Sequence, residues 1–210
     1  MFGAGQKKLA KDGYKGEEFN VTYPCAYDWL KAPPPCVYGT AYRHMMMRME
    51  ARVADGVFIG CTPTEIIKPA MEQVAIGAAK RDPKLKPIHV NAFWAWHVKA
   101  DRKEAYRESR RELAWRARKL DADLIRLWLS PEEVQTVVTN FDKFVAAWFD
   151  RSGNIQGVSE EMCNRLCEGL TSTGGVEDLD REIDRFRKFA QAGQTEIALR
   201  LHDNPMDALK

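Results

Sequence analysis

Apolar residues along this chain fall into two patterns: short continuous runs, and longer stretches in which they recur every three or four positions. The short runs predict strands, and there are four of them: Cys36 to Tyr38, Gly56 to Ile59, Ile88 to Val98 and Glu196 to Leu201. The run from Ile88 to Val98 is almost wholly apolar and aromatic, which is typical of a strand covered on both faces of a parallel sheet.

Between these runs, apolar residues recur at the spacing of a helix. The predicted helices cover about Tyr42 to Val53, Pro63 to about Lys80, Asp101 to about Leu129, Pro131 to about Phe149, a short segment holding Cys163 and Cys167, and a final stretch beginning at Gly174-Gly175. In the second helix, Thr62 and Glu65 are spaced as a capping box around Pro63. In the final helix, the apolar stripe is Leu179, Ile183, Phe186 and Ala190.

Strands that alternate with helices predict an α/β fold with parallel strands and right-handed crossovers. Residues 1–35 are rich in glycine and end in three prolines, so we expect a connecting segment there and the main domain over 36–210. The last residues resemble the opening of a further helix. Four strands that end in mid-unit indicate part of a larger structure.

The composition indicates which kinds of binding partner the chain can attract. Lys and Arg number 32 against 30 Asp and Glu, so no general field attracts nucleic acid or an anionic membrane. The Arg-rich stretch "YRESRRELAWRARK" has glutamates at helical spacing, Glu104, Glu108 and Glu112, and we expect a solvated helix face. No apolar run reaches the length of a membrane span. Five scattered cysteines without a secretory leader indicate the cytoplasm.

Small residues follow the first two predicted strands, where a β/α fold binds ligands. Gly39, Thr40 and Ala41 precede a helix, so their backbone amides and the Thr40 hydroxyl are candidates for holding an anion, with Arg43 as an added cation. Gly60, Cys61 and Thr62 occupy the corresponding place after the second strand. Plain turn chemistry is the alternative at both places.

Two further sets of residues lie on or after the later strands. Trp94 and Trp96 share one face of their strand, where they either fill the core or line a flat substrate pocket. His97 lies on the opposite face and is expected to be structural. His202, directly before Asp203, is the weak catalytic candidate.

Three segments together resemble a known family. They are "VYGTAYRHMMMRMEARVADGVFIGCTP", "IHVNAFWAWHVKADRKEAYR" and "LTSTGGVEDLDREIDRFRKFAQAGQTEIALRLHDNP". In order and spacing they resemble the C-terminal half of the bacterial luciferase-like monooxygenase superfamily, whose members use flavin or a deazaflavin coenzyme. The resemblance implies part of a TIM (β/α)8 barrel, namely its last four β/α units with parallel strands and extra helices.

The resemblance also implies a function. It predicts a flavin- or deazaflavin-dependent oxidoreductase that acts on a small organic substrate, with FMN or coenzyme F420 as the cofactor and with Gly39, Thr40 and Ala41 near its phosphate. The alternative is a non-catalytic half-barrel subunit or fragment. Because nothing here corresponds to the first four strands, either a second copy of the chain or a complementary chain is expected to supply them.

Overall fold

The computed structural model describes residues 14, 15, 17, 20, 21, 35–60, 62–119, 121–203 and 206. The chain divides into two compact units, residues 1–37 and 38–210. In the first unit, strand β1 (Tyr14–Lys15) pairs antiparallel with β2 (Asn20–Val21). Most of the predicted connecting segment lies outside the described residues.

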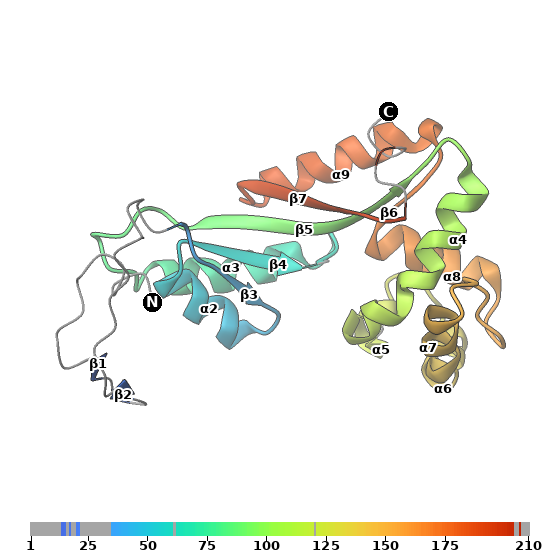
Figure 1. Ribbon diagram of the computed structural model, residues 1–210, viewed down its shortest axis with the longest axis horizontal. Coiled ribbons are helices and arrows are strands. Elements are labelled where there is room, and N and C mark those ends of the chain that lie inside the picture. Colours follow the sequence, from blue (N-terminus) through green and yellow to red (C-terminus); the bar gives the residue numbers. More distant parts are fainter. Residues whose placement is uncertain are drawn as a thin grey trace. The chain divides into compact units, whose positions relative to one another are not determined.

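The second unit is built on one parallel sheet (Figure 1). Its strands are β3 (Tyr38–Ala41), β4 (Gly56–Gly60), β5 (His89–Val98), β6 (Ser172–Gly174) and β7 (Glu196–Leu201). The long strand β5 pairs with β4 along its first half, with β7 along its middle and with β6 at its end. The parallel α/β fold expected from the sequence is therefore confirmed, whereas β6 is an additional strand that no apolar run predicts.

Strand β3 is displaced from its predicted position of Cys36 to Tyr38. It pairs with β4 from Tyr38, opposite Gly56, to Ala41, opposite Ile59. Cys36 and Val37 are exposed, whereas Ala41 is fully buried in the core between the sheet and the first helix. The burial of Ala41 therefore determines where β3 lies along the chain, although the apolar run that precedes it is the stronger strand signal in the sequence.

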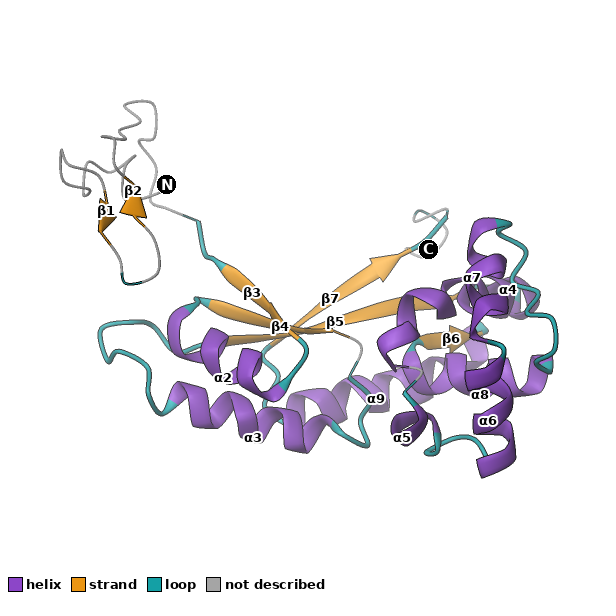
Figure 2. Cartoon of the chain, turned by 90° about the horizontal axis from the view of Figure 1, so that it is seen from below, coloured by secondary structure: helices purple, strands orange, loops and turns teal. Residues whose placement is uncertain are grey.

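Three helices cover one face of the sheet (Figure 2). They are α2 (His44–Val53), α3 (Ile67–Ala78) and α9 (Leu179–Gln191), the last preceded by the short η2 (Val176–Asp178). The other face is not covered by a described helix over β3 and β4, whereas α4 (Arg102–Glu112) lies against it at the end of β5, where Glu108 contacts His97. A core of buried side chains joins α2 and α3 to the sheet: Ala41, Met47, Ala51, Val57, Ile59, Ala70, Val74 and Val90. Phe189 of α9 packs edge-on against Trp94, with ring centroids 5.1 Å apart.

Helix α3 begins later than predicted, and the expected capping box is absent. Its N-cap is Ile66, whereas the Thr62 hydroxyl donates to the Gly60 carbonyl at 3.4 Å. Pro69 explains this start, because a proline is tolerated in the first helical turn, where its missing N–H would have no partner. Residues 64–66 form a turn instead of helix.

A layer of helices connects β5 to β6. It consists of α4 (Arg102–Glu112), η1 (Leu113–Lys119), α5 (Ala122–Ile125), α6 (Pro131–Thr139), α7 (Phe141–Phe149) and α8 (Glu160–Leu170). The two long helices expected here are thus broken, the first at Leu113 and the second at Asn140. The layer has its own core, which includes Leu113, Ile125, Val137, Phe144, Leu166 and Leu170. None of the described helices is long and apolar enough to cross a membrane.

Candidate functional site at the carboxyl ends of the strands

The inner face of α4 carries charge into the protein interior, where it meets the ends of β5 and β7. Glu108, Arg111 and Glu112 are buried, as is Arg116 of η1. The expectation of a solvated helix face is therefore wrong for this side of α4. The reason is that the charged partners come from distant strand ends, which helical spacing alone does not reveal.

Glu108 is the best-paired of these groups. Its carboxylate accepts from His97 Nδ1 at 2.8 Å and forms an ion pair with Lys99 Nζ at 2.8 Å. Burial alone would raise the pKa of Glu108, but the hydrogen bonds from His97 and Lys99 outweigh it, so the pKa is lowered. Burial lowers the pKa of His97 despite its bond to Glu108. This arrangement favours a neutral imidazole held against an ionised carboxylate.

His202 stacks on His97, with ring centroids 4.6 Å apart and an interplanar angle of 20°. Its Nδ1 lies 3.5 Å from Glu112, and burial, followed by electrostatic coupling to His97, lowers its pKa to about 3. The Nε2 atoms of both rings are buried without a hydrogen bond to any described residue. The structure thus brings the weak catalytic candidate together with the histidine expected to be structural, and a catalytic role for His202 stays a prediction.

Glu112 differs from Glu108 although it lies one helical turn further along. Its carboxylate is 3.5 Å from His202 Nδ1 and 3.6 Å from the nearest nitrogens of Arg111 and Arg200. Burial therefore dominates and raises the pKa of Glu112. Arg111 instead binds Asp203 with two bonds of 2.8 and 2.9 Å.

The residues expected to hold a phosphate lie mostly within β3 and not in a loop. A side chain on Gly39 would meet the Glu50 carboxylate of α2, which is the end of a flexible side chain. Ala41 is buried on the same side, whereas Thr40 is exposed on the opposite face. Arg43 is exposed at the N-cap of α2.

The N-terminus of α2 is the part of this region that fits a phosphate. No described side chain caps it, and its first turn contains no acidic residue. Uncapped amides and the helix dipole favour an anion at such an end. The donors available are thus the amides at the start of α2 and the side chains of Thr40 and Arg43, a little further along the chain than the sequence indicated.

The second predicted loop is less well defined. A side chain on Gly60 would meet no described atom within 4 Å, so this glycine leaves open space on the sheet. Thr62 is buried and bonded to the Gly60 carbonyl. Cys61 lies outside the described residues.

The tryptophans of β5 pack against α9. Trp94 is buried beneath Phe189 and the Arg185 guanidinium, and its indole N–H donates to Ser172 at 2.9 Å. Trp96 lies against Phe186, with centroids 5.9 Å apart. Trp94 is therefore a core residue, the first of the two alternatives drawn from the sequence, and these contacts place both rings on the helix-covered face.

The opposite face of the sheet, which no described helix covers over β3 and β4, carries aromatic and polar side chains that were not among the sequence-based candidates. Tyr38, Phe58 and Phe93 form a row of rings with centroids 5.1 and 6.1 Å apart. At the Tyr38 end of this row, Glu196 accepts from Tyr38 at 3.0 Å and from Asn91 at 3.2 Å. The alternation along β5 and β7 was the available signal, because His89, Asn91, Phe93 and His97, and likewise Glu196 and Arg200, fall on one face of these strands.

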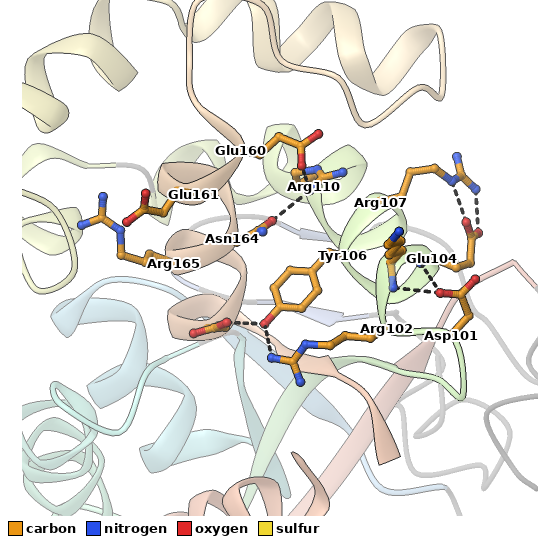
Figure 3. A pocket seen from close by; sticks show the side chains of 12 residues that line it. Asp101, Arg102, Glu104, Tyr106, Arg107, Arg110, Glu160, Glu161, Asn164 and Arg165 are labelled. Carbon is orange, nitrogen blue, oxygen red and sulfur yellow. Dashed lines mark hydrogen bonds and ion pairs between the residues drawn. The ribbon is translucent and has the colours of Figure 1, made fainter. Parts of the chain in front are cut away.

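An open groove of about 890 Å³ lies between α4 and α8 (Figure 3). At its centre the Tyr106 hydroxyl donates to Glu168 and accepts from Arg102. Burial, followed by the bond to Glu168, raises the pKa of Tyr106 to about 12. Arg110 donates to Asn164 at 3.0 Å. These side chains satisfy one another, and none of the predicted site residues lines the groove.

Comparison with protein families identifies the class of this chain. Residues 10–196 match the model of the luciferase-like monooxygenase family, so the chain belongs to that family. No curated protein matched the sequence.

Solved structures agree with the fold. A coenzyme F420-dependent tetrahydromethanopterin reductase from Methanopyrus kandleri has a TM-score of 0.64 at 18% identity, over 91% of this chain and 53% of that protein. A riboflavin lyase, solved with modified FMN and riboflavin, has a TM-score of 0.53 at 12% identity, over 97% and 46%. EDTA monooxygenase from Chelativorans sp. BNC1 has a TM-score of 0.50 at 15% identity, over 93% and 48%. The chain spans about half the length of these proteins.

Proposed function

We propose that this chain forms the C-terminal half of a flavin- or deazaflavin-dependent oxidoreductase that acts on a small organic substrate. The match to the luciferase-like family over residues 10–196 carries this proposal. FMN and coenzyme F420 are both candidates, because the similar structures include a protein named for F420 and one solved with modified FMN. The bound cofactor would supply the hydride or oxygen chemistry, and the protein would position it.

The cofactor phosphate is proposed to sit at the N-terminus of α2. This end has no side-chain cap among the described residues, no acidic residue in its first turn, and Arg43 beside it. Thr40 adds an exposed hydroxyl on the strand that leads into the helix. All these groups favour an anion.

Titration with FMN and with F420, followed by difference absorbance, tests this proposal. Arg43→Gln should weaken binding about fivefold at low salt, because an exposed cation contributes about 1 kcal/mol and is screened at high salt. Arg52→Gln is the matched control, since it removes the same charge in the last turn of the same helix. Equal affinities for both variants would argue against the phosphate site, and no binding of either cofactor by the parent would argue against the oxidoreductase itself.

The runner-up function is a half-barrel subunit that needs a partner chain. Among the described strands, β3 pairs only with β4, and β7 pairs only with β5, so each of them has one edge that no described strand covers. The row of Tyr38, Phe58 and Phe93 faces away from every described helix. Open parallel edges and a partly exposed aromatic face both favour closure by further strands.

Light scattering of the purified chain tests closure by a second copy. A dimer is expected if two copies complete each other, and its dissociation should expose Phe93 further. A cooperative, stable monomer would contradict closure by any partner.

A further inference from the structure

Two tryptophans of the helical layer form an exposed aromatic pair. Trp115 of η1 is 61% exposed, and it meets Trp148 of α7 edge to face, with centroids 5.3 Å apart and an interplanar angle of 88°. An indole ring is a large apolar group, and leaving it in water forfeits its burial energy. Such a pair on the surface is therefore a candidate for contact with a ligand.

Arg151 connects this pair to the end of the sheet. Its guanidinium lies 5.7 Å from the Trp148 ring centroid, and Nη2 donates to Asp203 Oδ1 at 3.1 Å. Asp203 follows the last residue of β7 by two positions and also binds Arg111. The tryptophan pair is thus tied to the carboxyl end of β7, the end at which parallel β/α folds bind ligands.

The backbone at this connection is strained. Arg151 has φ of 60° and Asp203 has φ of 46°, and they are the two non-glycine residues of the described chain with positive φ. This conformation costs free energy for a residue with a side chain, and it recurs at ligand sites, where the surroundings hold it in place. Both strained residues belong to the same ion pair.

We propose that Trp115, Trp148 and Arg151, here called the aromatic patch, bind a planar conjugated ring that carries a negative charge. The ring would stack on the indole face that the edge-to-face pair leaves open, and Arg151 would contact the anionic group. The assignment rests on the proposed function for its location at the reacting end of the sheet. Two sources have this chemistry, the cofactor itself and an aromatic acid as substrate.

Tryptophan fluorescence quenching measures binding at the patch directly. The probes are FMN, the planar anion 2-naphthoate, the neutral ring 2-naphthol and the non-aromatic anion cyclohexanecarboxylate. The parent chain should bind 2-naphthoate more tightly than it binds 2-naphthol or cyclohexanecarboxylate. Trp115→Leu should weaken naphthoate binding about tenfold through loss of stacking. Arg151→Asn should abolish the preference for naphthoate over naphthol, and asparagine tolerates the left-handed backbone.

Matched controls lie on the same layer. Leu127→Ala removes another exposed apolar side chain, and Arg126→Asn removes an exposed arginine paired within its own helical turn. Neither should change naphthoate binding, and circular dichroism should be the same for all four variants. If naphthoate and saturating FMN compete, the patch holds the cofactor ring. If both bind together, it holds the substrate.

Three results would overturn the proposal: no naphthoate binding by the parent, equal binding by parent and Trp115→Leu, or a Trp115→Leu variant whose main effect is to dissociate an oligomer. The last result would identify the patch as a protein contact. Failure here is distinct from failure of the proposed function, because binding of FMN or F420 at α2 is measured separately with Arg43→Gln and Arg52→Gln.

Discussion

Replacing Glu108 with glutamine tests the buried charge network. The change keeps the shape of the side chain and an acceptor for His97, but it removes the charge that Lys99 pairs with at 2.8 Å. Glu108 is 1% exposed and Lys99 is 15% exposed. Breaking a fully buried pair costs about 3–5 kcal/mol, and partial access of Lys99 to water reduces our expected loss of unfolding free energy to about 2–4 kcal/mol.

The matched control is Glu112→Gln, on the same helix one turn later. Glu112 is equally buried, yet its nearest arginine nitrogens are 3.6 Å away and its pKa is raised. Neutralising it should therefore change stability by less than about 1 kcal/mol, in either direction. Urea unfolding of parent and both variants at neutral pH, with the slope of the transition checked for constancy, measures the difference.

The pH dependence has a definite sign. Because the pKa of Glu108 is lowered in the folded state, its contribution is present above the unfolded value of 4.5 and is lost as the pH falls through the folded value. The gap between parent and Glu108→Gln should thus narrow below about pH 4.5. Equal losses for Glu108→Gln and Glu112→Gln, or a gap that widens in acid, would refute the reasoning.

Three further predictions concern packing and reactivity. Phe189→Ala should cost about 3–5 kcal/mol in urea unfolding because the ring is buried against Trp94, whereas Phe149→Ala, at a ring 78% exposed, should cost little. Iodoacetamide at pH 8 should label the exposed Cys36 but neither Cys163 nor Cys167, because burial raises the pKa of both thiols to about 12. Mass spectrometry before and after denaturation measures the labelling, and label on Cys163 or Cys167 of the folded chain would contradict the prediction. Gly77→Ala should lower the melting temperature because its methyl group would meet the Arg48 carbonyl where α2 packs on α3, whereas Gly60→Ala should be tolerated; the reverse order would contradict the packing described.

The main strands were predictable because apolar runs that are bounded by turn residues and rich in β-branched or aromatic side chains favour strands. Strand β6 was missed because Ser172, Thr173 and Gly174 give no apolar signal. Their burial is possible because hydroxyl groups satisfy one another, as where Thr173 donates to Ser109 at 2.8 Å. Such pairing depends on residues distant in sequence.

The site was predictable only in outline. His97 and His202 could be placed at strand ends from the sequence, but not their stacking or their glutamate partners. Helical periodicity assigns charged residues to the solvent-exposed face of a helix. That assignment was wrong for Glu108 and Glu112 because their charged partners come from β5 and β7 or from just beyond these strands. Gly39, Thr40 and Ala41 were expected to follow the first strand, but they lie within β3 because Ala41 is buried in the core and pairs with β4 opposite Ile59.

The helical layer leaves and rejoins the sheet at almost the same place. Trp96 and Val98 of β5 pair directly with Ser172 and Gly174 of β6, and the Lys99 amide donates to the Gly174 carbonyl at 3.2 Å. Residues 99–171 therefore behave as a cassette with neighbouring ends and an independent core. Such a cassette can be exchanged without changing the backbone hydrogen bonds that join β3, β4, β5 and β7, provided that its replacement supplies partners for His97 and Asp203, which Glu108 and Arg111 contact here.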